Sequence, residues 1–163
     1  MTALPARNLL GNATSPYLLL HKDNPVHRRP CTPEALAEAK ALDKPILLST
    51  GYTACHWCHV MAKESFADAA TAEVMNAHFV CIKVDREERP EVDLTYQTAL
   101  QALGQQGGWP LTMFLTPDGK AFGGGTYFPA AESNGRPAFA KFLADIHTAW
   151  TERRAEIEET AGK

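Results

Sequence analysis

Residues 46–58 read Ile-Leu-Leu-Ser-Thr-Gly-Tyr-Thr-Ala-Cys-His-Trp-Cys, and this stretch decides the fold. Its first five residues form a short, nearly continuous apolar run, which is typical of a strand buried on both faces. Gly51 begins a turn, and Cys55 stands where a helix should start. Two cysteines three positions apart, between a buried strand and a helix, favour a redox-active pair of thiols.

The position of this pair predicts how it would react. Free backbone N–H groups and the positive end of the helix dipole stabilise a thiolate, so we expect Cys55 to be the more exposed nucleophile with the lower pKa. Cys58 lies one turn further on the same helix face, from where it can resolve a mixed disulfide at Cys55. His56 would favour the thiolate and the reduced form. Trp57 is either a contact platform for a partner or an aromatic packed on the domain.

Working outward, the remaining sequence alternates helical and strand patterns. The predicted elements are a helix at 33–42, a strand at 46–50, a helical segment from 55 broken near 66–68, a strand at 79–84, a helix from 90 to 103, strands at 111–115 and 121–126 joined by a turn at 116–120, and a helix from about 136 into the Glu-rich tail. This order predicts a mixed central sheet in a three-layer α/β/α sandwich. Residues 1–31 hold four prolines and predict an irregular arm, followed by one domain over 32–163.

Length and composition set limits on the function. The chain has 163 residues, enough for one domain with a core, and its formal net charge of -3 provides no broad positive field. We therefore expect no binding to nucleic acid or to a membrane. The early apolar run at 17–20 is too short for a membrane span or a secretory segment, and four cysteines are few for a secreted disulfide scaffold. These features predict a cytoplasmic protein with reduced thiols.

Other readings of the two cysteines stay open. Cys55, Cys58 and His59 match the c-type haem attachment signature, and the same three residues could hold zinc together with a further ligand. The sequence has no second C-x-x-C to close a tetrahedral zinc site, so we expect no metal and no cofactor. Two packed cysteines without a role are the remaining alternative.

Trp109 and Pro110 stand at the entrance of the strand predicted at 111–115. An X-Pro bond there is either cis, which is a costly and usually purposeful feature, or an ordinary trans bond at a strand end. The cis form would leave a neighbouring backbone edge free to pair with a peptide.

Several motifs together resemble a known family. They are Ser15-Pro16-Tyr17-Leu18-Leu19, Asn24-Pro25-Val26, Lys44-Pro45-Ile46, Gly51-Tyr52, Cys55-His56-Trp57-Cys58-His59-Val60-Met61, residues 83–90 and Gly107-Gly108-Trp109-Pro110-Leu111-Thr112. Over about residues 8–129 the chain resembles the amino-terminal domain of the spermatogenesis-associated protein 20 (YyaL-type) family, within the thioredoxin superfamily. The resemblance implies a thioredoxin-like fold in which a cis proline at Pro110 lies against the cysteine pair. Family members usually continue into a larger helical α/α toroid, and the sequence leaves open whether this chain is an excerpt or a short homologue.

The chain departs from the family and superfamily patterns at two places. His27, Arg28 and Cys31 stand where the family usually has Asp-Trp and a further Trp, which puts the role of the arm in doubt. Ser49 falls where many thioredoxins have a buried acid that accepts a proton.

Another base is therefore needed to deprotonate Cys58, and the candidates are Glu64, His59 and Asp85. Asp85 begins the charged run at 85–89. This run is either a catalytic or metal-binding cluster at a strand end or a solvated turn whose carboxylates lie near a helix N-terminus.

Taken together, these patterns predict a thioredoxin-fold thiol-disulfide oxidoreductase. Cys55 attacks, Cys58 resolves, and Trp109 and Pro110 shape a groove for a protein or a small thiol or disulfide substrate. The alternative is a non-catalytic thioredoxin-like module that docks a larger helical domain or a partner protein, with structural or regulatory cysteines.

Overall fold

The computed structural model describes residues 18, 29–30, 33–52, 55–63, 69–105, 107–109, 111–126 and 139–161. Its strands are β1 (Arg29–Pro30), β2 (Ile46–Gly51), β3 (Val80–Asp85), β4 (Leu111–Leu115) and β5 (Ala121–Gly125). Its helices are α2 (Pro33–Leu42), α3 (His56–Lys63), α4 (Ala69–His78), α5 (Pro90–Ala102), α6 (Phe139–Glu152) and α7 (Arg154–Ala161). Each strand and helix predicted from residue 33 onward is confirmed, with small shifts at the ends and a break in the last helix.

Among the described residues, the strands form one mixed sheet in the order β1-β3-β2-β4-β5. The central strand β2 is parallel to β3 and antiparallel to β4, and β4 forms a hairpin with β5. Strand β1, which no sequence pattern predicts, pairs in parallel with β3 through Arg29 and Pro30. The rest of the 1–31 arm, apart from Leu18, lies outside the described residues, as does Cys31.

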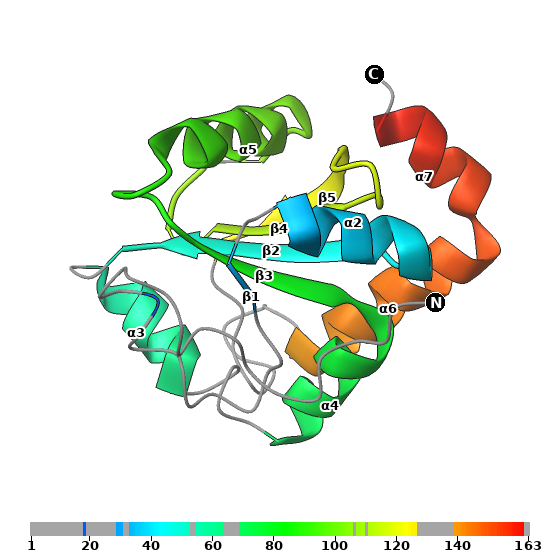
Figure 1. The fold of residues 1–163 in the computed structure, drawn as a ribbon, viewed down its shortest axis with the longest axis horizontal. Coiled ribbons are helices and arrows are strands. Elements are labelled where there is room, and N and C mark those ends of the chain that lie inside the picture. Colours follow the sequence, from blue (N-terminus) through cyan, green and yellow to red (C-terminus); the bar gives the residue numbers. More distant parts are fainter. Residues whose placement is uncertain are drawn as a thin grey trace.

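Helices cover both faces of this sheet, so the predicted three-layer sandwich is confirmed (Figure 1). Successive side chains of a strand point to opposite faces, which divides the core into two clusters. One cluster lies on the α2 and α5 side and includes Ile46, Leu48, Val80, Ile82 and Met113. The other lies on the α3, α4 and α6 side and includes Leu47, Met61, Cys81 and Phe114. Cys81 is 1% exposed and its thiol donates to the Met75 carbonyl at 3.6 Å, in agreement with its predicted place in the core.

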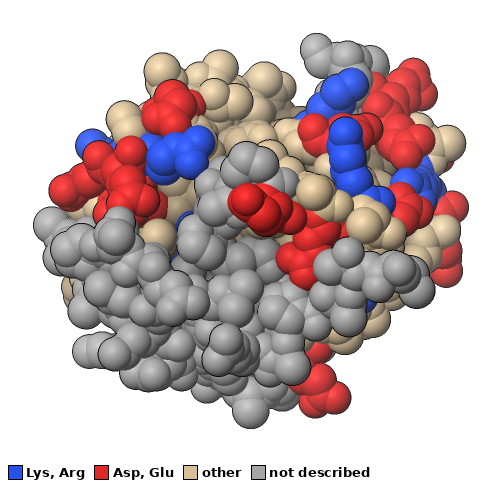
Figure 2. Space-filling view, in the orientation of Figure 1, with Lys and Arg blue, Asp and Glu red and all other residues tan. Residues whose placement is uncertain are grey.

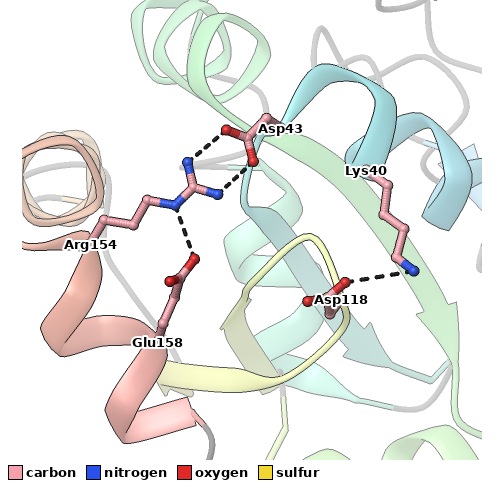
Figure 3. Close-up of polar contacts among 5 residues, drawn as sticks. All are labelled: Lys40, Asp43, Asp118, Arg154 and Glu158. Atoms are coloured by element: carbon pink, nitrogen blue, oxygen red, sulfur yellow. Dashed lines mark hydrogen bonds and ion pairs between the residues drawn. The ribbon is translucent and has the colours of Figure 1, made fainter.

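The last predicted helix is split where Arg153 separates α6 from α7. The bend brings α7 toward the end of α2, and Arg154 bonds both carboxylate oxygens of Asp43 at 2.6 Å (Figure 3). The same guanidinium donates to Glu158 at 3.1 Å and lies 4.3 Å from the Trp150 ring centroid. We call these four residues the Arg154 clamp. Its hydrogen bonds hold the pKa of Asp43 below its ordinary value and raise that of Arg154.

Two surface features complete the description. Acidic and basic side chains are interspersed on the face shown in Figure 2, near the start of α5 and over α2 and α7. Within the described part of the chain, no helix has the length and apolar character needed to cross a membrane.

Candidate redox site

Cys55 caps the helix that carries the two cysteines. Its carbonyl accepts the first bond of α3, from the His59 N–H at 3.3 Å, while its own N–H donates to the Tyr52 carbonyl at 3.1 Å. This is the N-cap position, where the next backbone N–H groups have no partner within the helix. The structure has Cys55 in a disulfide bond. Once that bond is reduced, these free N–H groups, together with the helix dipole, favour a negative charge on the sulfur.

Two aromatic side chains pack against Cys55, which is 5% exposed. The residue packs with Leu18, Tyr52 and Trp109 in a small cluster separate from the two main core clusters. The rings of Tyr52 and Trp109 meet edge to face, with centroids 5.8 Å apart and planes at 84°. Cys55 is therefore a buried residue in contact with aromatic side chains. Only the backbone of Cys58 is described, so the greater exposure of Cys55 stays a prediction.

The Arg86 guanidinium packs against the rings of both Tyr52 and Trp109. Its guanidinium carbon lies 4.3 Å from the Trp109 ring centroid and 4.8 Å from that of Tyr52, within the range of cation–π contacts. Its backbone N–H donates to the Gly51 carbonyl at 2.9 Å, so the turn after β3 is tied to the end of β2. We call Tyr52, Arg86 and Trp109 the aromatic-arginine cluster.

Helix α5 holds Trp109 in place. The indole Nε1 donates to the buried Asp93 carboxylate at 2.9 Å. Gln97 bonds both backbone groups of Gly108, donating to its carbonyl at 2.8 Å and accepting from its N–H at 3.0 Å. A Cβ at Gly107 would come within 2.6 Å of the Gln97 Oε1, so a larger residue there would have to displace the Gln97 amide. These contacts fix the loop before β4 against α5, with Trp109 packed on Cys55.

An open groove of about 840 Å3 runs from this cluster along α5. Its lining includes Arg86, Pro90, Leu94, Gln97, Gln101 and Trp109. Leu94 is 68% exposed, which is unusual for a large apolar side chain. The groove thus offers apolar contacts from Pro90, Leu94 and Trp109, amide groups, and charges of both signs from Arg86 and Glu87.

The structure brings several of the predicted site residues together. Cys55 and Trp109 share one cluster, His56 is exposed at the first position of α3, and His59 is half-buried one turn on. Only the backbone of Trp57 and Cys58, on α3, is described. Glu64 and Pro110 lie outside the described residues, so the cis bond stays a prediction.

Asp85 ends β3 and is 7% exposed. Its carboxylate accepts the Glu87 N–H at 2.9 Å and its carbonyl accepts the N–H groups of Glu88 and Arg89. The run at 85–89 is thus a turn, with Glu87 and Glu88 exposed. Within the described residues, no three His, Cys, Asp or Glu side chains gather as a metal site would require.

Three residues of this site were missed by sequence reasoning: Arg86, Asp93 and Gln97. From the sequence, Arg86 is only one member of a charged run, because nothing local shows that it meets rings 34 and 23 positions away. Asp93 and Gln97 carried a usable signal, since they are polar residues four positions apart on a helix whose apolar positions already define its buried face.

A cysteine stands at the N-cap of the helix that follows a central parallel strand, beside the loop that enters an antiparallel strand. This arrangement defines a thioredoxin-like fold. Solved structures agree in fold. A DsbH oxidoreductase superposes with a TM-score of 0.58 at 21% identity, covering 78% of this chain and 86% of the other. A thioredoxin from Thermus thermophilus gives 0.56 at 23% identity, covering 79% and 95%.

The chain belongs to the family described as "Protein of unknown function, DUF255" (Thioredox_DsbH), whose family model matches residues 7–163. It is 49% identical over 153 residues to uncharacterized protein B0495.5 of Caenorhabditis elegans, covering 94% of this chain and 21% of that protein. Spermatogenesis-associated protein 20 of Mus musculus is 48% identical over 143 residues, covering 88% and 18%. The human protein of that name is 44% identical over 154 residues, covering 94% and 20%. The chain spans about a fifth of the length of these relatives, and the predicted family is confirmed.

Proposed function

We propose that this domain is a thiol-disulfide oxidoreductase that works through Cys55 and Cys58. The observation that carries the proposal is the position of Cys55 at the N-cap of α3, packed against Trp109. A thiolate is the reacting species in disulfide exchange, and a helix N-terminus stabilises it. The fold shared with a DsbH oxidoreductase and a thioredoxin supports the same class of reaction.

The reaction needs two exchange steps. The Cys55 thiolate attacks one sulfur of a substrate disulfide, which forms a mixed disulfide and releases the other substrate sulfur as a thiolate. The Cys58 thiolate then attacks the Cys55 sulfur, which forms the Cys55–Cys58 disulfide and releases the second substrate thiolate. The cysteine pair loses two electrons, the substrate gains them, and the released thiolates take up protons from solvent.

The groove beside Trp109 favours a polypeptide substrate. Leu94 offers an exposed apolar contact, while Gln101 and the Arg86 guanidinium offer polar ones along α5. A small disulfide could reach Cys55 without touching α5. We therefore expect a protein or peptide disulfide to react faster than a small one.

A redox titration tests the proposal. The chain is equilibrated in glutathione buffers of graded ratio, its thiols are alkylated, and the disulfide is located by mass spectrometry. We expect a reversible Cys55–Cys58 bond that C55S abolishes, and a C58S variant that traps substrates as mixed disulfides. Absence of a reversible bond in the wild-type chain would refute the reaction.

A docking module is the second candidate, and the length of the relatives favours it. Because the chain corresponds to about a fifth of those proteins, the domain has a much larger neighbour in them. Binding of the separately produced remainder of the mouse relative, measured by calorimetry with the reduced wild-type chain and with C55S, would test this role. Equal affinity, together with no redox activity, would favour the module over the enzyme.

A further inference from the structure

Helix α5 carries a carboxylate that is buried next to the redox site. Asp93 is 8% exposed, and its Oδ1 accepts the Trp109 Nε1–H at 2.9 Å and a second hydrogen bond from the Gln97 Nε2 at 3.5 Å. Aspartates are rarely buried, because removing a carboxylate from water is costly unless the charge is paired. The two exchange steps of the proposed reaction do not use this group, so its burial needs another explanation.

The indole N–H does not require a charged partner. Trp Nε1 is a donor only, and a neutral carbonyl or amide oxygen would satisfy it. One turn further along α5, the neutral amide of Gln97 satisfies both backbone groups of Gly108, at 2.8 and 3.0 Å. The same helix therefore holds the loop once with an amide and once with a carboxylate, and hydrogen bonding alone does not explain the charge of Asp93.

Opposite charges contact the Trp109 ring at its edge and on its face. Asp93 binds the edge at Nε1, while the Arg86 guanidinium carbon lies 4.3 Å from the ring centroid. An aromatic ring has a positive edge and a negative face, so each charge lies where the ring attracts it. Because a hydrogen bond polarises its partners, the carboxylate also strengthens the attraction between the indole and the guanidinium. Two charge-assisted contacts thus hold one ring.

This ring is the one that packs against Cys55. Trp109 is half-buried, belongs to the cluster of Leu18, Tyr52 and Cys55, and also lines the groove along α5. A movement of the ring would change both the exposure of Cys55 and the shape of the groove. The side chain at which a substrate and Cys55 meet is therefore held in position by Asp93.

We propose that Asp93 is a positioning residue that sets specificity: through the Trp109 indole it holds the ring against Cys55 and favours polypeptide disulfides over small reagents. This inference rests on the function proposed above. A small reagent meets a shielded sulfur and gains no contacts along α5. A polypeptide gains contacts with Leu94, Gln101 and the fixed ring, which offset the restricted access. The effect is a difference between substrates in binding rather than a change in the exchange chemistry.

The test compares variants of the full chain at two residues. D93L replaces the carboxylate by an apolar group with the same branching, and the nearly isosteric D93N removes only the charge. W109F keeps an aromatic ring without the N–H, and the double variant D93L/W109F shows whether Asp93 acts through the indole. E91Q is the matched control, because Glu91 is an exposed carboxylate of α5 that bonds Arg89 and does not line the groove.

Two measurements are made on each variant after circular dichroism has checked the fold. In a C58S background, iodoacetamide labelling at high pH, where the thiolate is fully formed, reports access to Cys55. Mass spectrometry follows Cys81 in the same samples, because this core cysteine is 1% exposed and its labelling reports opening of the whole domain. With the cysteine pair intact, insulin reduction gives kcat and KM for a polypeptide substrate.

We expect D93L to label Cys55 about tenfold faster than the wild-type residue does, as for the loss of a hydrogen bond to a charged group. KM for insulin should rise while kcat stays nearly unchanged. D93N should show the same changes to a smaller extent, and it carries the test if D93L does not fold. E91Q should behave as wild type, Cys81 labelling should not change, and D93L should have no further effect in W109F.

Wild-type labelling of Cys55 in a folded D93L, or a D93L effect that persists in W109F, overturns the role of Asp93 and leaves the proposed reaction intact. If D93L and D93N accelerate labelling of Cys55 and Cys81 alike, Asp93 is a structural residue and the positioning role is rejected. If the wild-type chain forms no reversible disulfide, the proposed function fails and the specificity role fails with it, even where labelling shows that Asp93 holds the ring.

Discussion

Two arginines stack on tryptophans at opposite ends of the central strand, each with its guanidinium carbon 4.3 Å from a ring centroid. Arg154 covers Trp150 near Asp43, which precedes β2, and Arg86 covers Trp109 beside the residues that follow β2. The Arg154 charge is engaged by two carboxylates, Asp43 and Glu158. Within the described residues, no carboxylate forms an ion pair with Arg86. The same stacking contact thus serves to fasten a helix at one end and leaves a positive charge facing a groove at the other.

The surroundings of Arg154 and Arg86 also differ in size and in the side chains that line them. Asp43, Arg154 and Glu158 of the clamp line a smaller hollow of about 380 Å3. Its lining also includes Lys40 and Asp118, which are themselves paired at 3.6 Å (Figure 3). The groove at Arg86 is more than twice that volume and carries the exposed Leu94. Among the described residues, ion pairs therefore mark the end of the sheet at Arg154, while at the cysteine end Arg86 lines the groove beside Glu87 without forming one.

The largest expected effect is on activity at Arg86. R86A removes a cation–π contact from the rings of Tyr52 and Trp109, which pack against Cys55, and it removes a positive charge from the groove. We expect kcat/KM for a protein disulfide to fall about tenfold, equivalent to about 1.4 kcal/mol, with an unfolding free energy close to that of wild type. The insulin reduction assay measures the first quantity and urea denaturation the second. R86K, which keeps the charge but not the planar group, separates the two contributions. Full activity in R86A would contradict the comparison.

Arg154 should give the reverse pattern with a smaller effect. R154A removes two exposed ion pairs and one stacking contact, so we expect a loss of about 1 kcal/mol in unfolding free energy. Disulfide exchange should be unchanged, because the clamp lies at the other end of the sheet. Urea denaturation and the same reduction assay provide the measurement, and reduced activity in folded R154A would show that the two ends are coupled.

A stacked pair of titratable rings sharpens the contrast with the permanently charged arginines. His78 of α4 and His147 of α6 lie with centroids 3.7 Å apart and planes at 20°. Burial, followed by the charges of His147 and Lys44, lowers the pKa of His78 from its ordinary value of about 6.5. The folded state therefore binds fewer protons than the unfolded state below that value, and stability decreases as pH falls from about 7 to 5. Melting temperatures of wild type and H78Q over this range should converge at the lower pH. Parallel curves would exclude the linkage.

The smallest expected effect concerns the ion pair between Asp43 and Arg154, tested separately from the stacking of Arg154 on Trp150. The hydrogen bonds from Arg154 lower the pKa of Asp43, so the carboxylate contributes stability above its unfolded pKa of about 3.9 and loses it as pH falls below that value. The Asp43 side chain is 60% exposed, which limits this contribution to less than about 1 kcal/mol. Wild type and D43N, compared by urea denaturation, should differ above pH 5 and become equal near pH 2. A difference that persists at pH 2 would show that the pair is not the cause.

The elements of this fold could be predicted because each has a local signal. The apolar run at 46–50 and the Pro at position 90 mark a buried strand and a helix start whatever surrounds them. The break between α6 and α7 has no such signal, since Arg154-Ala-Glu-Ile-Glu continues as good helix-forming sequence. The bend coincides with the contact of Arg154 to Asp43, 111 positions earlier, which periodicity cannot show.

For the same reason, only part of the candidate site could be predicted from the sequence. Cys55 is placed by a short strand and a helix that adjoin it in sequence. Lys83 looked like an ordinary member of a strand, and its burial beside Ser49 depends on the parallel register of β2 and β3. The aromatic-arginine cluster draws on three separate segments of the chain. Sequence thus indicated where the reacting group stands, while the groups that surround it are set by tertiary structure.

The short strand β1 has a consequence for how copies of the molecule meet in concentrated solution. Strands at the margin of a sheet can recruit a foreign strand, which begins aggregation. Within the described residues, the margin beside β3 is covered by Arg29 and Pro30, and Pro30 has no N–H to offer an incoming chain. This described edge thus offers fewer hydrogen-bonding groups in a row than the longer strand β3 would, which disfavours edge-to-edge pairing.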